Sequence, residues 1–136
     1  MGLTIGQLAL HSGVNVETIR YYERRGLITQ PLKPERGYRR YPDGTVTRLR
    51  FIKRSKSLGF TLREISDLLS LSEEAMENCG NIKARAKSKI DEIKEKIIRL
   101  KSMKRPLEIL SDSCGREEFS QGCPLVDALN ADTKKL

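Results

Sequence analysis

Apolar side chains at helical spacing predict two short helices within the first 26 residues. Thr4 is placed to cap the first helix, which runs to about His11, and Asn15 is placed to cap the second, which ends at Gly26. Residues 12–14 include a glycine and interrupt the apolar pattern between the two helices. Two helices joined by a tight, glycine-containing turn are typical of a helix-turn-helix.

A different pattern follows over residues 27–41, where two prolines and a glycine precede the sequence Tyr38-Arg39-Arg40-Tyr41. The alternation and the β-favouring tyrosines predict a short hairpin strand. A basic hairpin directly after a helix-turn-helix is a wing, so we expect a winged helix-turn-helix.

Two further helices are predicted after the wing. Asp43 is placed to cap a third helix that stops near Gly59. Thr61 and Glu64 have the spacing of a capping box, which opens a fourth helix. The following stretch, 71–81, is expected to be a connector.

The longest predicted helix runs from Ile82 to Arg105, where no Gly or Pro interrupts the chain. Its apolar positions recur at steps of four and three residues: Ala86, Ile90, Ile93, Ile97 and Leu100. This heptad seam predicts a coiled-coil helix about 36 Å long, which Pro106 is expected to end or kink. Because nothing else in so short a chain is large enough to cover the seam, we expect a second subunit to cover it.

Basic residues are concentrated in the first half of the chain. The whole chain has 26 Lys and Arg against 18 Asp and Glu, a net charge of +8. Residues 1–69 hold 13 basic and 6 acidic side chains, whereas residues 70–136 hold 13 and 12. A cationic half that also carries tyrosines indicates a nucleic acid as partner. The candidate DNA contacts lie on the second helix and the wing: Thr18, Arg20, Tyr21, Arg24, Arg36, Tyr38 and Arg39.

The composition also weighs against other classes of function. The alternative to a DNA interface is a basic surface that is simply solvated. Tyr22 lies at apolar spacing with Ile19, so we predict that it is a core residue and does not contact DNA. One histidine and no arranged acid, base or phosphate-binding loop argue against an enzyme. No apolar stretch approaches the roughly 18 residues of a membrane helix, so we expect no membrane partner and a cytoplasmic location.

All three cysteines, Cys79, Cys114 and Cys123, lie in the second half of the chain. Thiolates are soft ligands, and three of them without a nearby histidine favour a thiophilic ion. The long helix separates Cys79 from the other two, so we expect the third sulfur of a shared site to come from the other subunit. The alternative is a thiol redox sensor in which Cys114 and Cys123 form a reversible disulfide, which does not require Cys79.

The first seventy residues resemble the MerR family of bacterial transcription regulators. The resemblance rests on these segments: Thr4 to Ala9, Gly13-Val14, Thr18 to Glu23, Gly26 to Ile28, Gly37 to Arg39, Tyr41, Phe51 to Lys53 and Leu58 to Ile65. It implies a homodimer joined by an antiparallel coiled coil, two winged DNA-binding domains and an effector site at the far end of the coil. It also implies binding between promoter elements held too far apart for RNA polymerase, with the effector making the dimer bend and underwind the DNA.

With this resemblance the predicted fold is mostly α. It comprises a winged helix-turn-helix DNA-binding domain over residues 1–70, a connector over 71–81 and a long antiparallel coiled-coil dimerisation helix over 82–110. A short metal-binding loop and a C-terminal turn occupy 111–136.

The tail separates the effectors within this family. Sensors of monovalent copper, silver or gold usually have Ser where Cys79 stands, and zinc sensors add a Cys and a His between the positions of Cys114 and Cys123. The spacing of those two cysteines and the following Pro124-Leu125 are most similar to the mercuric-ion sensors, in which three thiolates hold the metal. The resemblance therefore implies Hg(II) as the effector, held by Cys79, Cys114 and Cys123, with lead, cadmium or zinc as alternatives.

Overall fold

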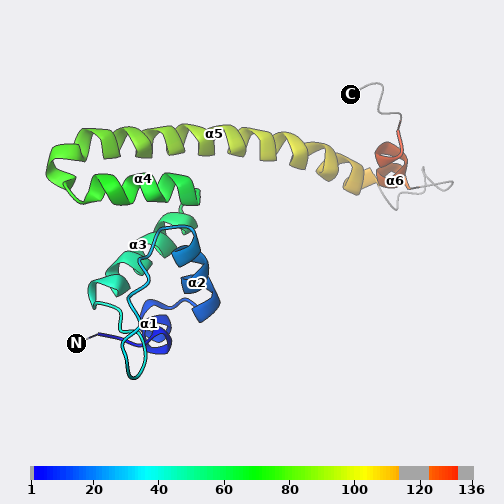
Figure 1. Cartoon of the computed structure of the whole chain (residues 1–136). Coiled ribbons are helices and arrows are strands. Elements are labelled where there is room, and N and C mark those ends of the chain that lie inside the picture. Colours follow the sequence, from blue (N-terminus) through cyan, green and yellow to red (C-terminus); the bar gives the residue numbers. More distant parts are fainter. Residues whose placement is uncertain (1, 114–122, 132–136) are drawn as a thin grey trace. The chain divides into compact units, whose positions relative to one another are not determined.

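The computed structural model describes residues 2–113 and 123–131. The described part is mostly helical (Figure 1), with these helices in chain order: α1 (Ile5–Ser12), α2 (Val16–Arg24), α3 (Gly44–Ser57), α4 (Leu62–Ser72), α5 (Ala75–Ser113) and α6 (Pro124–Leu129). The chain divides into two compact units, Met1–Arg85 and Ala86–Leu136, and the boundary falls within α5. Each unit is described separately.

Side-chain caps fix where three of the short helices begin. The Thr4 hydroxyl accepts a hydrogen bond from the Gln7 N–H, and the Gln7 side chain accepts one from the Thr4 N–H, which forms a capping box at α1. Asn15 Oδ1 accepts from the Thr18 N–H at 2.7 Å to cap α2. Thr61 and Glu64 form a second capping box at α4. The caps predicted at Thr4, Asn15 and Thr61 are confirmed.

One apolar core joins the first four helices. Its buried members come from α1 to α4 and the loops around α2: Leu8, Ile19, Tyr22, Leu27, Ile28, Tyr41, Leu49, Ile52, Ile65 and Leu69. Burial of these side chains stabilises the unit mainly through the hydrophobic effect. The predicted place of Tyr22 in the core is confirmed, because only 5% of its surface is exposed.

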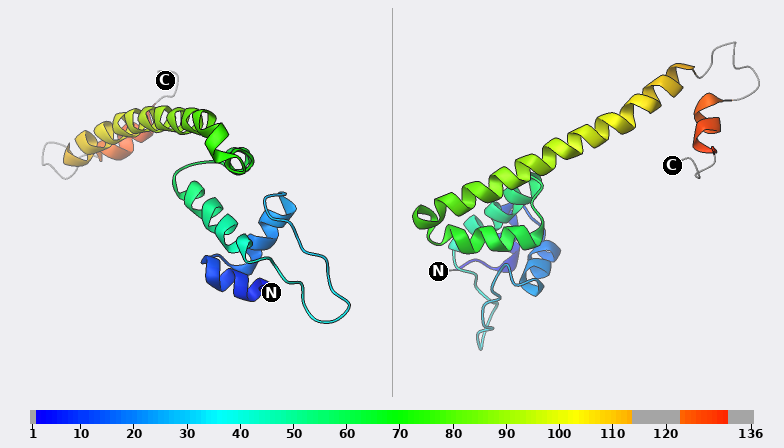
Figure 2. Two further views of the ribbon diagram at one scale, coloured as in Figure 1. Left: turned by 90° about the vertical axis from the view of Figure 1, so that its left-hand side faces the viewer. Right: turned by 90° about the horizontal axis from the view of Figure 1, so that it is seen from above.

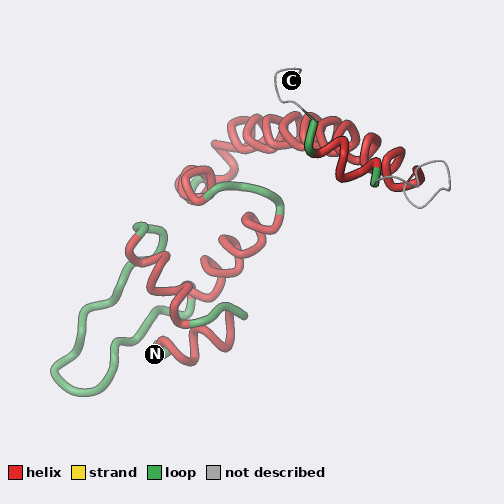
Figure 3. Tube along the Cα trace, turned by 90° about the vertical axis from the view of Figure 1, so that its right-hand side faces the viewer, coloured by secondary structure: helices red, strands yellow, loops and turns green. Residues whose placement is uncertain are grey.

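The segment between α2 and α3 is a long loop without a regular strand (Figures 2 and 3). Its one β-type pairing is an isolated antiparallel bridge, in which the N–H groups of Leu3 and Tyr41 each donate to the other's carbonyl at 2.8 and 2.7 Å. The predicted hairpin strand is therefore wrong. Within the loop, Pro31 and Pro34 lack the N–H groups that a hairpin ladder needs, and Gly37 has a φ of 88°, which is outside the strand region.

Three basic side chains of α3 bind backbone carbonyls on either side of α2. Arg48 Nε donates to the Leu27 carbonyl at 2.6 Å, after α2. Arg50 Nη2 donates to the His11 carbonyl at 3.1 Å and Lys53 Nζ to the Gly13 carbonyl at 2.8 Å, both before α2. These bonds attach both ends of α2 to α3. The predicted Asp43 cap of α3 is absent, because the Asp43 side chain makes no capping hydrogen bond.

A short turn joins α4 to α5, where a longer connector was expected. Helix α5 begins at Ala75 rather than at Ile82, so most of the stretch 71–81 is helical. The first turns of α5 run antiparallel to α4 (Figures 1 and 2), and Arg85 forms an ion pair with Asp67 at 2.8 Å. Cys79 consequently lies on a helix.

Helix α5 continues through Pro106 to Ser113, so of the two expected effects of Pro106, an end or a kink, the end is wrong. Proline removes one backbone donor, and the helix-forming residues on both sides preserve the remaining hydrogen bonds. At 39 residues and 1.5 Å per residue, α5 is about 58 Å long.

Apolar side chains recur along the second unit's part of α5 and remain exposed. They include Ile90, Ile93, Ile97, Leu100, Met103 and Leu107, with exposed fractions between 39% and 61%.

The predicted last turn is confirmed as α6. None of the helices in the described part of the chain is long and apolar enough to cross a membrane.

Candidate functional site

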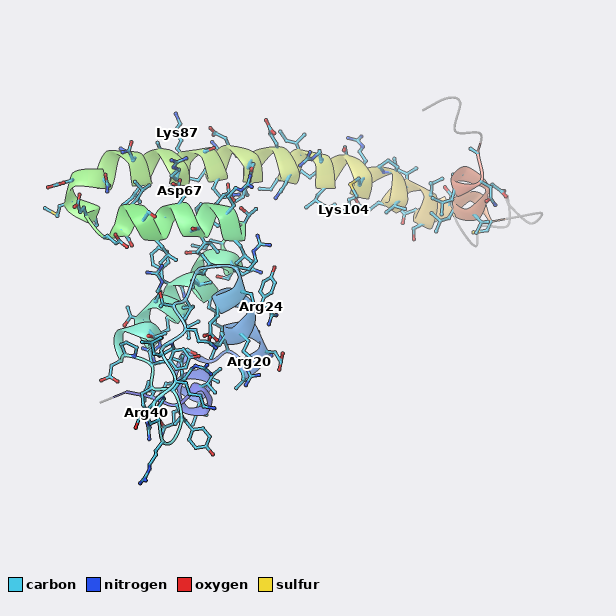
Figure 4. All side chains as sticks on the ribbon, viewed as in Figure 1. Arg20, Arg24, Arg40, Asp67, Lys87 and Lys104 are labelled. Carbon is cyan, nitrogen blue, oxygen red and sulfur yellow. The ribbon has the colours of Figure 1, made fainter. Side chains whose placement is uncertain are left out.

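The exposed side of α2 carries basic and aromatic side chains. Figure 4 shows Arg20 and Arg24, one helical turn apart, projecting from this helix. Tyr21 is 39% exposed and lies within reach of Arg24 and Arg25, each with its guanidinium carbon 5.9 Å from the ring centroid. These cation–π contacts hold the two guanidinium groups near the tyrosine ring at the end of α2.

Thr18 has a structural contact in addition to its predicted one. Its N–H and its hydroxyl both donate to Asn15 Oδ1, at 2.7 and 2.8 Å. Thr18 lines a hollow of about 380 Å³ together with Tyr21 and Lys56, the last of which comes from α3. Lys56 is not among the predicted contacts, and its basic character within α3 is the signal in the sequence that could have indicated it.

The loop between α2 and α3 (residues 25–43), here called the wing loop, presents the second group of predicted contacts. Tyr38 is 77% exposed, Arg36 is exposed, and Arg39 is half-buried. Arg39 Nε donates to the Pro31 carbonyl at 3.0 Å, which ties the two sides of the loop together.

A groove of about 550 Å³ brings residues of α2 and the wing loop together. Of the predicted DNA contacts, it is lined by Arg20, Arg24, Tyr38 and Arg39, whereas Thr18, Tyr21 and Arg36 lie outside it. Three arginines around one open groove form a positively charged surface that suits a phosphodiester backbone. The groove is also lined by residues that the sequence analysis did not select as functional: Thr4, Ile5, Glu23, Gln30 and Tyr41.

Tyr41 is a buried residue that also lines this groove. Its side chain is only 2% exposed, and its hydroxyl donates to Glu23 Oε2 at 3.1 Å. Burial, together with the charge of Glu23 and the hydrogen bond to it, raises the pKa of Tyr41 to about 12, while the charges of Arg39 and Arg20 act in the opposite direction. The hydroxyl therefore remains a donor at neutral pH.

The cysteines lie at widely spaced positions along the chain. Cys79 is exposed in the second turn of α5, and Cys123 is half-buried at the N-cap of α6. Cys114 lies outside the described residues. Within residues 2–113 and 123–131, no three His, Cys, Asp or Glu side chains are placed to hold one metal ion. The predicted trio therefore stays a prediction.

Comparison with known proteins places the chain in a family. The family model "MerR HTH family regulatory protein" matches residues 3–72, and the model "MerR, DNA binding" matches residues 46–110. The chain belongs to the MerR family. This MerR-family chain is thus a helix-turn-helix DNA-binding regulatory protein and not an enzyme, as the sequence analysis expected.

Relatives of this MerR-family chain include regulators named for metals. The mercuric resistance operon regulatory protein of Bacillus cereus is 44% identical over 129 residues, which cover 95% of this chain and 98% of that protein. A MerR from Bacillus megaterium MB1, solved with mercury(II), is 42% identical with a TM-score of 0.71 over 93% of this chain and 98% of that one. PbrR691 from Ralstonia metallidurans CH34, solved with lead(II), is 31% identical with a TM-score of 0.78 over the same shares.

The raised pKa of Tyr41 predicts a change in stability and in tyrosinate absorbance at high pH. The folded chain holds the phenol proton more tightly than the unfolded chain does, because the pKa of Tyr41 rises from 10.0 to about 12. Its contribution to stability is therefore fully present below about pH 10 and is lost as the pH rises through about 12. We expect Tyr41→Phe to remove the tyrosinate absorbance that develops near pH 12, and Tyr38→Phe to leave that component in place. Tyrosinate absorbance near pH 12 that persists in Tyr41→Phe would contradict the assignment of the raised pKa to Tyr41.

Proposed function

We propose that this chain is a metal-responsive transcription regulator that binds promoter DNA as a homodimer and responds to Hg(II) through Cys79, Cys114 and Cys123. The observation that carries the proposal is the 44% identity to a mercuric resistance operon regulator over 95% of this chain. The three cysteines of the second half supply ligands of the softness that Hg(II) prefers.

DNA binding is assigned to the groove and to the exposed side of α2. Thr18, Arg20, Tyr21 and Arg24 face the bases and phosphates from α2, and Arg36, Tyr38 and Arg39 bind the flanking backbone from the wing loop. Support comes from the three arginines that line the groove and from the exposure of Tyr38 and Arg36.

Dimerisation is assigned to α5. Its apolar side chains at heptad spacing are exposed in the single chain, and an antiparallel copy of the same helix supplies a surface of the same character and length. Such a dimer places two DNA-binding domains on one operator, with roughly 34 Å or a multiple of it between the half-site centres.

The metal site is assigned across the dimer. Cys79 lies in the second turn of α5, whereas Cys114 directly follows the last residue of α5 and is 35 positions after Cys79. In an antiparallel pair, the beginning of one α5 meets the end of the other. Cys79 of one subunit would thus join Cys114 and Cys123 of its partner, and these thiolates would bind the metal in their deprotonated form.

Metal binding would change transcription by shifting the dimer between two states. An effector shifts such an equilibrium only by its difference in affinity for the two states, so the metal must favour the state that distorts the DNA. The distortion brings the promoter elements into the alignment that RNA polymerase requires, and the deformability of the DNA transmits the signal.

Lead(II) is the second candidate effector, because the lead-bound PbrR691 is similar to 93% of this chain with a TM-score of 0.78. Cadmium and zinc also bind thiolate ligands, so they are the remaining candidate ions. A thiol redox response is the alternative that involves no metal ion. The two differ in their need for Cys79, which the proposed metal site requires and a disulfide between Cys114 and Cys123 does not.

The DNA interface predicts a specific effect of Arg39→Ala. Loss of one phosphate contact should weaken operator binding and reduce the slope of log K against log salt concentration by about 1. Lys104→Ala removes the same charge from α5 and should leave the slope unchanged. The measurement is a salt titration of operator binding, and an unchanged slope for Arg39→Ala would mean that Arg39 contacts no phosphate.

The metal site predicts a separation of sensing from DNA binding. Cys79→Ala should abolish the metal response while leaving operator affinity of the metal-free protein within about twofold, since Cys79 lies outside the DNA-binding segments. Met76→Ala, which removes an exposed sulfur side chain three residues earlier, is the matched control and should keep the response.

The readouts are ultraviolet thiolate-to-metal absorption of the purified protein and promoter output with mercury, lead, cadmium and zinc. A response that survives Cys79→Ala but disappears in a non-thiol reductant would contradict metal sensing and favour the redox alternative. Loss of DNA binding in Cys79→Ala would contradict the proposed separation of roles.

A further inference from the structure

One carboxylate lies among the cations of the groove. Glu23 lines it together with Arg20, Arg24 and Arg39. A surface that binds phosphates loses affinity when it holds a negative charge, because like charges repel. The location of Glu23 at this surface therefore indicates a role other than contact with the phosphate backbone.

The role follows from the contact that Glu23 makes. Its Oε2 accepts a hydrogen bond from the Tyr41 hydroxyl at 3.1 Å, across 18 positions of the chain. Tyr41 is itself fixed, since its ring is buried in the core and its N–H and carbonyl both pair with Leu3. The hydroxyl is thus a donor in a fixed position, and Glu23 is attached to it from α2.

The two ends of this hydrogen bond belong to the two DNA-binding segments. Glu23 lies three residues after Arg20 and one before Arg24 on α2. Tyr41 lies two residues after Arg39 on the wing loop, and Arg39 is tied to Pro31 by its own hydrogen bond of 3.0 Å. The Glu23–Tyr41 bond therefore crosses from one segment to the other at the groove.

We infer that Glu23 and Tyr41 are positioning residues for DNA recognition, whose hydrogen bond sets the spacing between α2 and the wing loop. The spacing lets Arg20 on α2 and Arg39 on the loop engage one half-site together. The inference rests on the proposed DNA interface and adds two residues that do not themselves contact DNA.

Positioning acts on specificity more than on overall affinity. Non-specific binding depends on charge, which is the same when the loop shifts relative to α2. Operator binding requires base and phosphate contacts to form together, so it is sensitive to their spacing. Loss of the bond should lower the preference for operator over random DNA.

The experiment compares variants that separate the hydrogen bond from the charge. Tyr41→Phe removes only the hydroxyl and keeps the buried ring, whereas Glu23→Gln keeps an acceptor oxygen and removes the charge. Tyr22→Phe removes the hydroxyl from another buried ring of the same core, outside the proposed DNA contacts, and is the matched control. The full-length protein is titrated with an operator duplex, selected from random-sequence DNA by the wild-type protein, and with a random duplex of equal length.

We expect Tyr41→Phe to lower operator affinity roughly tenfold and to leave random-DNA affinity within about twofold. Glu23→Gln should bind random DNA more tightly and keep more of the operator preference than Tyr41→Phe does. Adding Arg39→Ala to Tyr41→Phe should cost less operator affinity than Arg39→Ala costs alone, because the shifted loop has already weakened that contact.

Three results would overturn the inference. Equal losses for operator and random DNA would show that the bond serves stability alone, as would additive effects of Tyr41→Phe and Arg39→Ala. Unchanged operator binding in both Tyr41→Phe and Glu23→Ala would show that the bond has no role, and Glu23→Ala provides the test if Tyr41→Phe does not fold. If Arg20→Ala and Arg39→Ala alone leave binding unchanged, the DNA interface itself is wrong, which distinguishes that failure from failure of the positioning role.

Discussion

The exposed apolar seam of α5 is the constraint on which the rest of the account depends. A helix of 39 residues with Ile90, Ile97 and Leu100 half-exposed leaves apolar surface in contact with water. In the proposed dimer, a second copy of the helix would remove that surface from water. If the copies are antiparallel, the same pairing brings Cys79 of one chain to the chain end that carries Cys123 of the other. One unfavourable exposure would therefore account for both the proposed dimer and the location proposed for its metal site.

The DNA-binding unit meets a different requirement, because it must hold the short helix α2 in a fixed orientation. Helix α2 has nine residues, too few to be stable alone in water. Packing of Ile19 and Tyr22 in the core fixes one side of it. Arg48 and Lys53 of α3 bind backbone carbonyls beyond its two ends, so part of the basic charge of this unit holds the recognition helix in place.

Local chemistry made much of this fold predictable, whereas contacts between distant residues were not. Thr4, Asn15 and Thr61 cap helices because their partners lie three residues away. The Glu23–Tyr41 bond spans 18 positions, and no periodicity signals it. The predicted wing strand is wrong because the prolines of this loop outweigh the strand preference of its tyrosines. Of the end or kink predicted at Pro106, the end is wrong because neighbouring turns maintain the helix. The cysteine trio is predicted from residue type alone, and the site proposed for it needs two chains, so no pattern within one chain can test it.

Mixed dimers test most directly the claim that the sensor is complete only when two chains pair. One chain carries Cys79→Ala and the other carries Cys114→Ala with Cys123→Ala, and each homodimer alone lacks a complete site. Co-purified heterodimers should recover one thiolate-to-metal absorption site per dimer and part of the Hg(II)-dependent promoter output. Absence of both signals in heterodimers that still bind operator DNA would contradict a site shared between subunits.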